Sequence, residues 1–236
     1  MQQNDMETNG QQTICLTAGV PRLPQVRLAE PATVAFGADE HIAIMGPNGA
    51  GKSLLVDLLT GKYPLAEGML TYDFRPSTSA SAFDNIRTIA FRDTYGSADA
   101  NYYYQQRWNA HDQDDAPTVR QQLGPVKDEE HRRRLFDLFG LEPLMDKKII
   151  LLSSGELRKF QLAKALLTEP RVLVMDNPFI GLDADTRRLL NDLLERIART
   201  GAVQLVLVLS MLDDVPPFIT HVVPVAERRV GRKQTR

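Results

Sequence analysis

This 236-residue sequence has one cysteine, no long apolar stretch and no large excess of either charge. The single cysteine, Cys15, excludes an internal disulfide and is compatible with a reducing compartment. No stretch approaches the roughly 18 consecutive apolar residues of a membrane-spanning helix. The polar N-terminal segment, residues 1–12, lacks the apolar core of a secretory signal. We therefore expect a cytoplasmic protein that would meet a membrane only peripherally, at its inner face.

The formal net charge of −2 gives no overall attraction to nucleic acid or to an anionic membrane surface. Basic residues gather only in the C-terminal tail, residues 228–236. For this tail we expect a solvated, frayed end, with a contact to a partner or a membrane surface as the alternative. Nucleic acid is not expected as a partner, since no basic stripe runs through the rest of the chain.

Apolar runs alternate with amphipathic segments, which favours an α/β fold with a mainly parallel sheet flanked by helices. Predicted strands cover two short pieces of residues 34–45, residues 171–175, and the continuous apolar run 203–209. Predicted helices cover residues 53–60 and 127–139, a segment capped by Ser153 or Ser154 that runs to Thr168, and residues 185–199.

A glycine-rich segment lies between the strand predicted to end at Met45 and the helix predicted to begin at Ser53. Its spacing is that of a phosphate-binding loop, in which glycines let backbone N–H groups surround phosphate oxygens while the helix N-terminus faces the anion. The loop consists of Gly46, Pro47, Asn48, Gly49, Ala50, Gly51, Lys52 and Ser53. It predicts binding of a nucleoside triphosphate. Lys52 is expected to reach the β- and γ-phosphates, and the Ser53 hydroxyl is expected to bind Mg²⁺.

Asp176 ends the apolar strand 171–175, where an acid would support Mg²⁺ indirectly, through one of the ion's ligands or through a water molecule. Upstream, residues 152–156 read Leu-Ser-Ser-Gly-Glu, and downstream come Asn-Pro-Phe at 177–179 and Gly-Leu-Asp at 181–183. In this order the motifs resemble the signature, Asp-Glu-Pro turn and D-loop of ATP-binding cassette (ABC) ATPases.

The resemblance covers about residues 30–225 and implies that ATP and Mg²⁺ are the cofactors. It also implies a head-to-tail dimer with a second copy or a second cassette. By position, Ser153 and Gly155 would then touch the γ-phosphate of the partner's ATP, and Asp183 would lie at the dimer seam. A P-loop NTPase fold with an inserted helical lobe and a small N-terminal β part is expected.

Two residues depart from the family at catalytic positions. Asn177 stands where the family has a glutamate, and an amide can orient a water but cannot take its proton. Met211 stands at the place of the switch histidine, and a thioether donates no hydrogen bond. His221 is expected to be structural. The catalytic candidates are therefore Lys52, Asp176 and Asn177, with slow hydrolysis.

Two further family contacts have no assigned residue. No aromatic precedes the loop where adenine would stack, and Phe36 lies too close to the loop to be assigned. The glutamine that joins the lobes is also unassigned, because Gln105 and Gln106 are out of register. The aromatic-rich residues 95–108 are interpreted as packing of the inserted lobe. Together with the turn at residues 177–183, this segment resembles the corresponding part of bacterial cassette proteins of the molybdenum-transport or photorepair type.

The sequence thus predicts a flexible N-terminus (1–12), one nucleotide-binding domain (13–227) with a helical lobe at about 93–150, and the basic tail (228–236). The first functional hypothesis is the ATP-hydrolysing subunit of an ABC transport system, with a membrane permease as a further partner. The second is an ATP-sensing module with negligible hydrolysis. The third is a soluble cassette that acts on nucleic acid.

Overall fold

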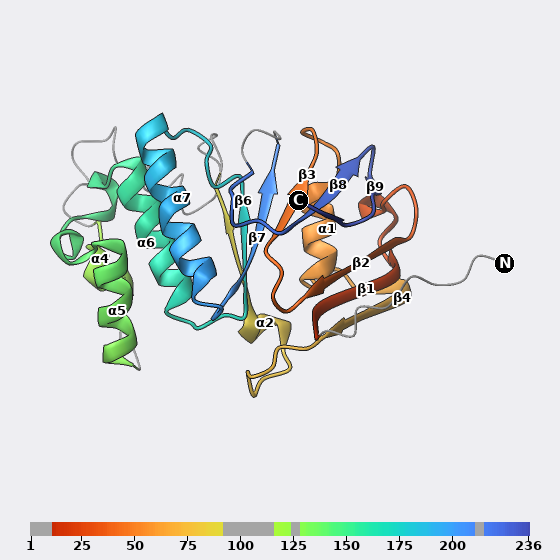
Figure 1. Cartoon of the computed structure of the whole chain (residues 1–236), viewed down its shortest axis with the longest axis horizontal. Helices are drawn as coiled ribbons and strands as arrows, with labels where there is room; N and C mark the ends of the chain where they lie inside the picture. Colours follow the sequence, from red (N-terminus) through yellow and green to blue (C-terminus); the bar gives the residue numbers. More distant parts are fainter. Residues whose placement is uncertain (1–10, 92–115, 124–127, 211–214) are drawn as a thin grey trace. The chain divides into compact units, whose positions relative to one another are not determined.

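The computed structural model describes residues 11–91, 116–123, 128–210 and 215–236. The chain divides into two compact units (Figure 1). Unit 1 comprises residues 1–86 and 204–236, and unit 2 comprises residues 87–203.

Unit 1 contains an antiparallel three-stranded sheet in the order β2–β1–β4. The strands are β1 (Gln12–Pro21), β2 (Ala32–Gly37) and β4 (Leu65–Tyr72). Apolar side chains of β1, including Ile14 and Leu16, are buried, which fixes the face that the sheet turns to the core. The sequence predicted β2 and a small N-terminal β part, but it did not give the bounds of β1 and β4.

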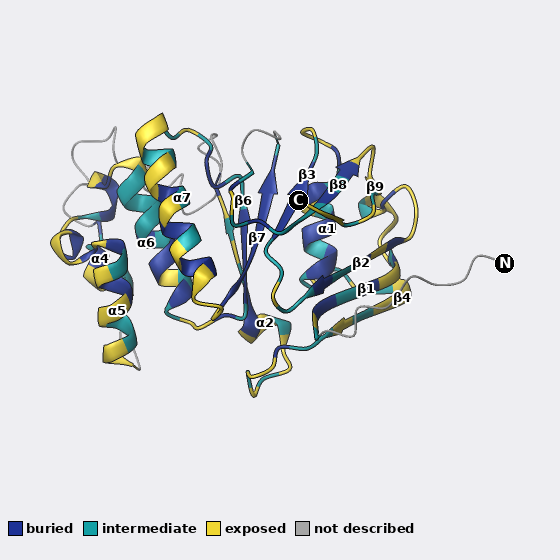
Figure 2. Ribbon diagram, in the orientation of Figure 1, coloured by how far each residue is buried: buried dark blue, intermediate teal, exposed yellow. Residues whose placement is uncertain are grey.

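The second sheet of unit 1 centres on β3 (Ile42–Met45) and follows the order β10–β8–β3–β7. Strand β3 runs parallel to both β7 (Gln204–Leu209) and β8 (His221–Ala226). Strands β9 (Arg229–Val230) and β10 (Gln234–Thr235) pair with β8 in the antiparallel sense. Every residue of β3 and β7 is buried (Figure 2), as expected for parallel strands covered on both faces.

Helix α1 (Lys52–Leu59) follows β3 and packs against β1. Its side chains Leu55 and Leu58 are completely buried, in agreement with the predicted helical spacing. Gly61 follows with a φ of 73°, the left-handed conformation that commonly ends a helix. Two short helices complete the unit, η1 (Pro24–Val26) and α2 (Ala82–Asn85).

Unit 2 is mainly helical around two neighbouring strands. Strand β5 (Ile86–Ala90) begins at the unit boundary and lies beside β6 (Val172–Asp176). Helix α5 packs against α6 (Figure 1). The helices are α4 (Val119–Leu123), α5 (Glu129–Phe139), η3 (Glu142–Leu144), η4 (Ile149–Leu151), α6 (Ser154–Leu166) and α7 (Ala184–Arg199).

The described part of the predicted inserted lobe is helical, from α4 through η4. Its helix α5 begins where the Asp128 side chain accepts hydrogen bonds from the N–H groups of Glu130 and His131. It ends at Gly140, which has a left-handed φ of 61°, as predicted. The aromatic-rich residues 95–108, with Gln105 and Gln106, lie outside the described residues. No helix of the described segments is long and apolar enough to cross a membrane.

The basic tail is folded, so the expectation of a frayed end is wrong. Lys233 Nζ donates to Glu40 Oε1 at 2.6 Å, and Arg236 Nη1 donates to the Pro216 carbonyl at 2.8 Å. Glu40 Oε2 also accepts the Gly37 N–H at 2.8 Å. Because Lys233 and Glu40 are 193 positions apart, local composition could not reveal this ion pair.

We predict that Glu40→Ala lowers the free energy of unfolding by about 1–3 kcal/mol, because Lys233 and the Gly37 N–H lose their shared acceptor. Chemical denaturation of the full chain measures the change. Glu30→Ala removes an exposed carboxylate from the same unit and is the control. Equal losses for both variants would contradict the assignment.

Candidate phosphate-binding site

The candidate phosphate loop, residues 46–53, connects β3 to α1 within unit 1. A Cβ at Gly46 would lie 1.9 Å from the Val225 carbonyl oxygen of β8, so only glycine fits there. Gly49 and Gly51 have φ values of 79° and 103°, which side-chain-bearing residues rarely adopt. The loop therefore requires glycine at three of its eight positions, once for space and twice for backbone conformation.

Lys52 is buried to 6% exposure at the start of α1. Its Nζ donates to the carbonyl oxygens of Gly46 at 2.7 Å and Pro47 at 3.0 Å. The ammonium group is thus folded back over the loop that precedes it. The N-cap residue Gly51 makes no side-chain cap hydrogen bond to α1, and the positive end of the helix dipole faces the loop. Ser53 is exposed in the first turn of the helix.

Two distant segments of unit 1 hold the loop from outside. Ser210 Oγ, just after β7, donates to Asn48 Oδ1 at 3.1 Å. The Arg228 N–H donates to the Ala50 carbonyl at 2.8 Å, and the Ala29 N–H donates to the Arg228 carbonyl at 2.8 Å. Sequence reasoning missed Ser210 and Arg228 as neighbours of the loop, since no local pattern brings positions so far apart together.

In unit 2, the signature-like segment forms the N-terminus of α6. Ser153 is the N-cap: its Oγ accepts the Glu156 N–H at 3.2 Å, and Glu156 Oε2 accepts the Ser153 N–H at 2.8 Å. This capping box selects Ser153 over Ser154. A serine oxygen that accepts a hydrogen bond can also donate one, and a side-chain hydrogen bond of Ser153 is among the interactions that lower the pKa of the Glu156 carboxyl.

The same capping box fixes the charge of Glu156. A hydrogen bond from Lys147 Nζ at 2.8 Å, followed by the Ser153 N–H, lowers the pKa of the Glu156 carboxyl. Lys147 thus offsets the negative charge that Glu156 brings to this helix end. Because its pKa is lowered, the Glu156 carboxyl is expected to be ionised at neutral pH.

Gly155 lies where α6 approaches α7. A Cβ at Gly155 would meet Thr186 Cγ2 at 3.0 Å, so a larger residue would press against α7. A hollow of about 190 Å³ between the two helices is lined by Ser153, Gly155, Thr186 and Leu189, among others. The glycine therefore permits close helix packing while leaving the α6 N-terminus accessible.

Asp176 and Asn177 follow each other at the end of β6. The Asp176 carbonyl accepts the Phe91 N–H at 2.9 Å, which ties the end of β6 to the residue after β5. Asn177 has a φ of 52°, in the left-handed region that asparagine tolerates better than glutamate. In the described part of the chain, no cluster of three or more His, Cys, Asp or Glu side chains could hold a metal ion. A metal here would need further ligands such as phosphate oxygens.

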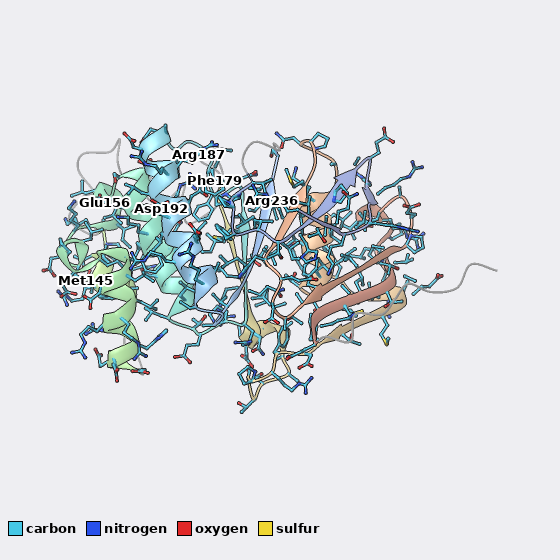
Figure 3. All side chains as sticks on the ribbon, in the orientation of Figure 1. Met145, Glu156, Phe179, Arg187, Asp192 and Arg236 are labelled. Atoms are coloured by element: carbon cyan, nitrogen blue, oxygen red, sulfur yellow. The ribbon has the colours of Figure 1, made fainter. Side chains whose placement is uncertain are left out.

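The turn after Asn177 is fastened to α6. Arg158 donates from Nη2 to the Ile180 carbonyl, and its guanidinium lies 4.6 Å from the centre of the Phe91 ring. Beyond the turn, Arg187 of α7 lies over the buried Phe179 ring at 5.7 Å; both residues are labelled in Figure 3. These contacts hold helix α6, helix α7 and the turn at residues 177–180 together within unit 2.

Asp183 is the N-cap of α7. Its Oδ1 accepts the Thr186 N–H, and its Oδ2 accepts the Thr186 hydroxyl, both at 2.8 Å. The Thr186 backbone bond, followed by the hydroxyl bond, lowers the pKa of the Asp183 carboxyl. The sequence assigned Asp183 to the D-loop and the dimer seam, and its capping role is an additional finding; the predicted helix start at Asp185 is corrected to Ala184.

The predicted site residues fall into two groups. The loop residues 46–53 are together in unit 1, and Ser153, Gly155, Asp176 and Asn177 are in unit 2. Met211 lies outside the described residues. His221 is structural, as predicted: its Nδ1 lies 2.9 Å from Thr220 Oγ1, and its Nε2 lies 3.5 Å from Glu40 Oε1.

Phe36, which the sequence left open as an adenine contact, is 1% exposed in the core of unit 1. A ring so completely buried has no free face on which a base can stack. The adenine contact is therefore not Phe36.

The fold and the glycine-dependent loop define a P-loop α/β nucleotide-binding protein. The model of the ABC transporter family matches residues 29–180. The chain is 31% identical over 207 residues to the ABC transporter ATP-binding protein ModF of Escherichia coli, covering 85% of this chain and 40% of ModF. It is 29% identical to the taurine import ATP-binding protein TauB of Pseudomonas fluorescens, covering 89% of this chain and 75% of TauB.

Among solved structures, cbiO1 from Clostridium perfringens, part of the ABC transporter complex cbiONQ, superposes with a TM-score of 0.72 at 21% identity. The match covers 95% of this chain and 89% of cbiO1. The chain belongs to the ABC transporter family and is an ATP-binding cassette of it. The predicted family and fold class are thereby confirmed, and the chain spans 40% of the length of ModF.

We predict that Gly46→Ala destabilises the protein by about 3 kcal/mol or more, because the new methyl group would overlap the Val225 carbonyl. Gly49→Ala is the matched comparison: nothing lies within 4 Å of its added Cβ, and it should cost only the backbone strain of about 1–2 kcal/mol. Denaturation curves of both variants measure the difference. A Gly46→Ala variant as stable as Gly49→Ala would refute the close approach.

Proposed function

We propose that this protein binds Mg-ATP through residues 46–53 and hydrolyses it slowly as part of a head-to-tail cassette dimer. Lys52 neutralises the β- and γ-phosphates, and backbone N–H groups of the loop surround the phosphate oxygens. Ser53 and Asp176 support Mg²⁺, with phosphate oxygens completing its coordination. Magnesium, when bound, supplies positive charge that stabilises the departing phosphate.

The observation that carries this proposal is the conformation of the phosphate loop. Glycine is required at Gly46 by a close backbone approach, and at Gly49 and Gly51 by positive φ angles. Lys52 is held at the loop by carbonyl oxygens that can release it to a stronger anionic acceptor. The same segment presents the uncapped end of α1. A triphosphate matches this combination of positive charge and N–H donors.

The N-terminus of α6 supports a role toward the ATP of a partner cassette. Ser153 and Ser154 are exposed, and Gly155 carries no side chain that would hinder an approaching phosphate. The Lys147–Glu156 ion pair keeps the local carboxylate from repelling an anion as strongly as a lone charge would. Ser153 and Gly155 are accordingly proposed to bind the γ-phosphate of the second nucleotide.

Asn177 is the reason for slow turnover. A general base in the family's glutamate position takes a proton from water, whereas the Asn177 amide can only orient that water. Its left-handed backbone would also strain a glutamate more than an asparagine. The residue thus suits a cassette that binds ATP well and releases phosphate slowly.

Transport is the wider role that we propose, with a membrane permease on another chain as partner. Support comes from the relative TauB, a taurine import ATP-binding protein of which this chain covers 75%. The site would lie at the cytoplasmic side of the membrane. The cargo would be chosen by the permease.

The alternative is an ATP-sensing cassette in which closure of the dimer, without useful hydrolysis, is the output. Asn177 favours it. Size-exclusion chromatography with Mg-ATP, combined with phosphate release, separates the two functions. ATP-dependent dimers without measurable phosphate release would establish the sensor, whereas dimers that turn over support the ATPase.

We predict that Lys52→Ala weakens Mg-ATP binding about 100-fold, since charge-assisted hydrogen bonds to two phosphates are lost. Calorimetric titration with and without Mg²⁺ measures the dissociation constant. Lys62→Ala, which removes an exposed ammonium from the same unit, should bind ATP as the wild type does. Unchanged binding by Lys52→Ala would overturn the proposed nucleotide site.

We predict that Asn177→Glu raises steady-state phosphate release by roughly 10²-fold, because it restores a general base. Asn177→Gln has the same length and the same backbone strain but no basic oxygen, so it should stay at the wild-type rate or below. If Glu and Gln variants release phosphate equally fast, charge at residue 177 does not limit turnover.

A further inference from the structure

The C-terminal hairpin of unit 1 turns at Glu227 and Arg228, between β8 and β9. Both residues have left-handed φ angles, 49° and 61°. Tight two-residue hairpins with positive φ at both positions strongly prefer asparagine, aspartate and glycine. A glutamate and an arginine there carry a backbone cost, so side-chain chemistry rather than turn geometry accounts for these residue types.

This hairpin is fastened to the phosphate loop through the backbone of Arg228. Its N–H donates to the Ala50 carbonyl, and its carbonyl accepts the Ala29 N–H, each at 2.8 Å. A Cβ placed on Gly51 would lie 3.3 Å from Arg228 Cα and 3.5 Å from Arg228 Cγ. The Arg228 side chain therefore leaves the hairpin directly alongside Gly51, the residue before Lys52.

Arg228 is exposed, and among the described residues its side chain makes no hydrogen bond or ion pair with a protein group. Two other basic groups of the tail are engaged elsewhere, Lys233 with Glu40 and Arg236 with the Pro216 carbonyl. A guanidinium matches the geometry of phosphate oxygens with two parallel N–H donors. The hairpin thus keeps an available cation beside the loop.

We propose that Arg228 is a nucleotide-binding residue whose guanidinium contacts the α- and β-phosphate end of the nucleotide. This inference rests on the proposed nucleotide site at residues 46–53. Loop N–H groups close to the helix hold the α- and β-phosphates, whereas Lys52 extends toward the β- and γ-phosphates. Because Arg228 adjoins Gly51, it stabilises bound ADP and bound ATP to the same extent and does not sense the γ-phosphate.

The test uses Arg228→Gly in the full chain. Glycine suits the left-handed turn, so the hairpin is retained while the charge is removed. We expect dissociation constants for Mg-ATP and Mg-ADP to rise together by about tenfold, the loss of one charge-assisted contact. The thermal midpoint of the nucleotide-free protein should stay the same or rise. Arg229→Ala removes the neighbouring exposed charge on β9 and should leave both constants unchanged.

Arg228→Lys provides a second readout, since it keeps the positive charge and should recover most of the affinity. The proposal is overturned if Arg228→Gly binds both nucleotides as the wild type does, or if only ATP binding weakens. It is also overturned if Arg228→Lys is as weak as Arg228→Gly, because the charge would then be irrelevant. Lys52→Ala is measured in parallel to test the nucleotide site itself. If Lys52→Ala binds ATP as the wild type does, the nucleotide site is wrong; if it binds weakly, the Arg228 results test Arg228 alone.

Discussion

The close contact between the phosphate loop and β8 is the constraint on which unit 1 depends. At Gly46 the loop backbone approaches the Val225 carbonyl so nearly that a single methyl group has no room. The loop begins at the end of β3, whose register with β7 and β8 is fixed by buried parallel pairing. From this anchored start, the loop curves through Gly49 and Gly51 into α1. Sheet register, hairpin position and loop curvature are therefore set together.

Much of this could be predicted from the sequence, because the determining signals are local. The continuous apolar run that became β7 and the leucine spacing of α1 each lie within a few residues. The glycine spacing of residues 46–53 is equally local, and it defines the loop with its flanking strand and helix. The order of the motifs around Ser153 and Asp176 gave the family for the same reason.

The parts that could not be predicted depend on contacts distant in sequence. Strand β1 is stabilised by pairing with β2 and β4, and its own residues mix apolar and polar side chains without a clear pattern. The tail looked solvated because of its arginines, yet Lys233 meets Glu40 near the other end of the chain. The position of Arg228 beside the phosphate loop could not be predicted for the same reason. Its significance comes from Ala50 and Ala29, to which its backbone is bonded.

The departures from the family are physically consistent with one another. Asn177 adopts a left-handed backbone, and in the proposed function its amide cannot act as a general base, while the Glu156 carboxylate is paired with Lys147. The phosphate loop, by contrast, keeps every feature needed to hold an anion. The loop geometry supports the proposed nucleotide binding, and Asn177 is the residue on which the proposed slow turnover rests, so we propose that binding and turnover are separable.

The proposed nucleotide site requires the loop amides to act as the phosphate ligands. The most direct measurement is a titration of isotope-labelled protein with Mg-ATP, followed through the amide NMR signals of Gly49, Gly51 and Lys52. We expect these three amides to show the largest shifts, with saturation at one nucleotide per chain. If they stay unmoved while ATP binds, or if the largest shifts lie outside residues 46–53, the central claim is wrong.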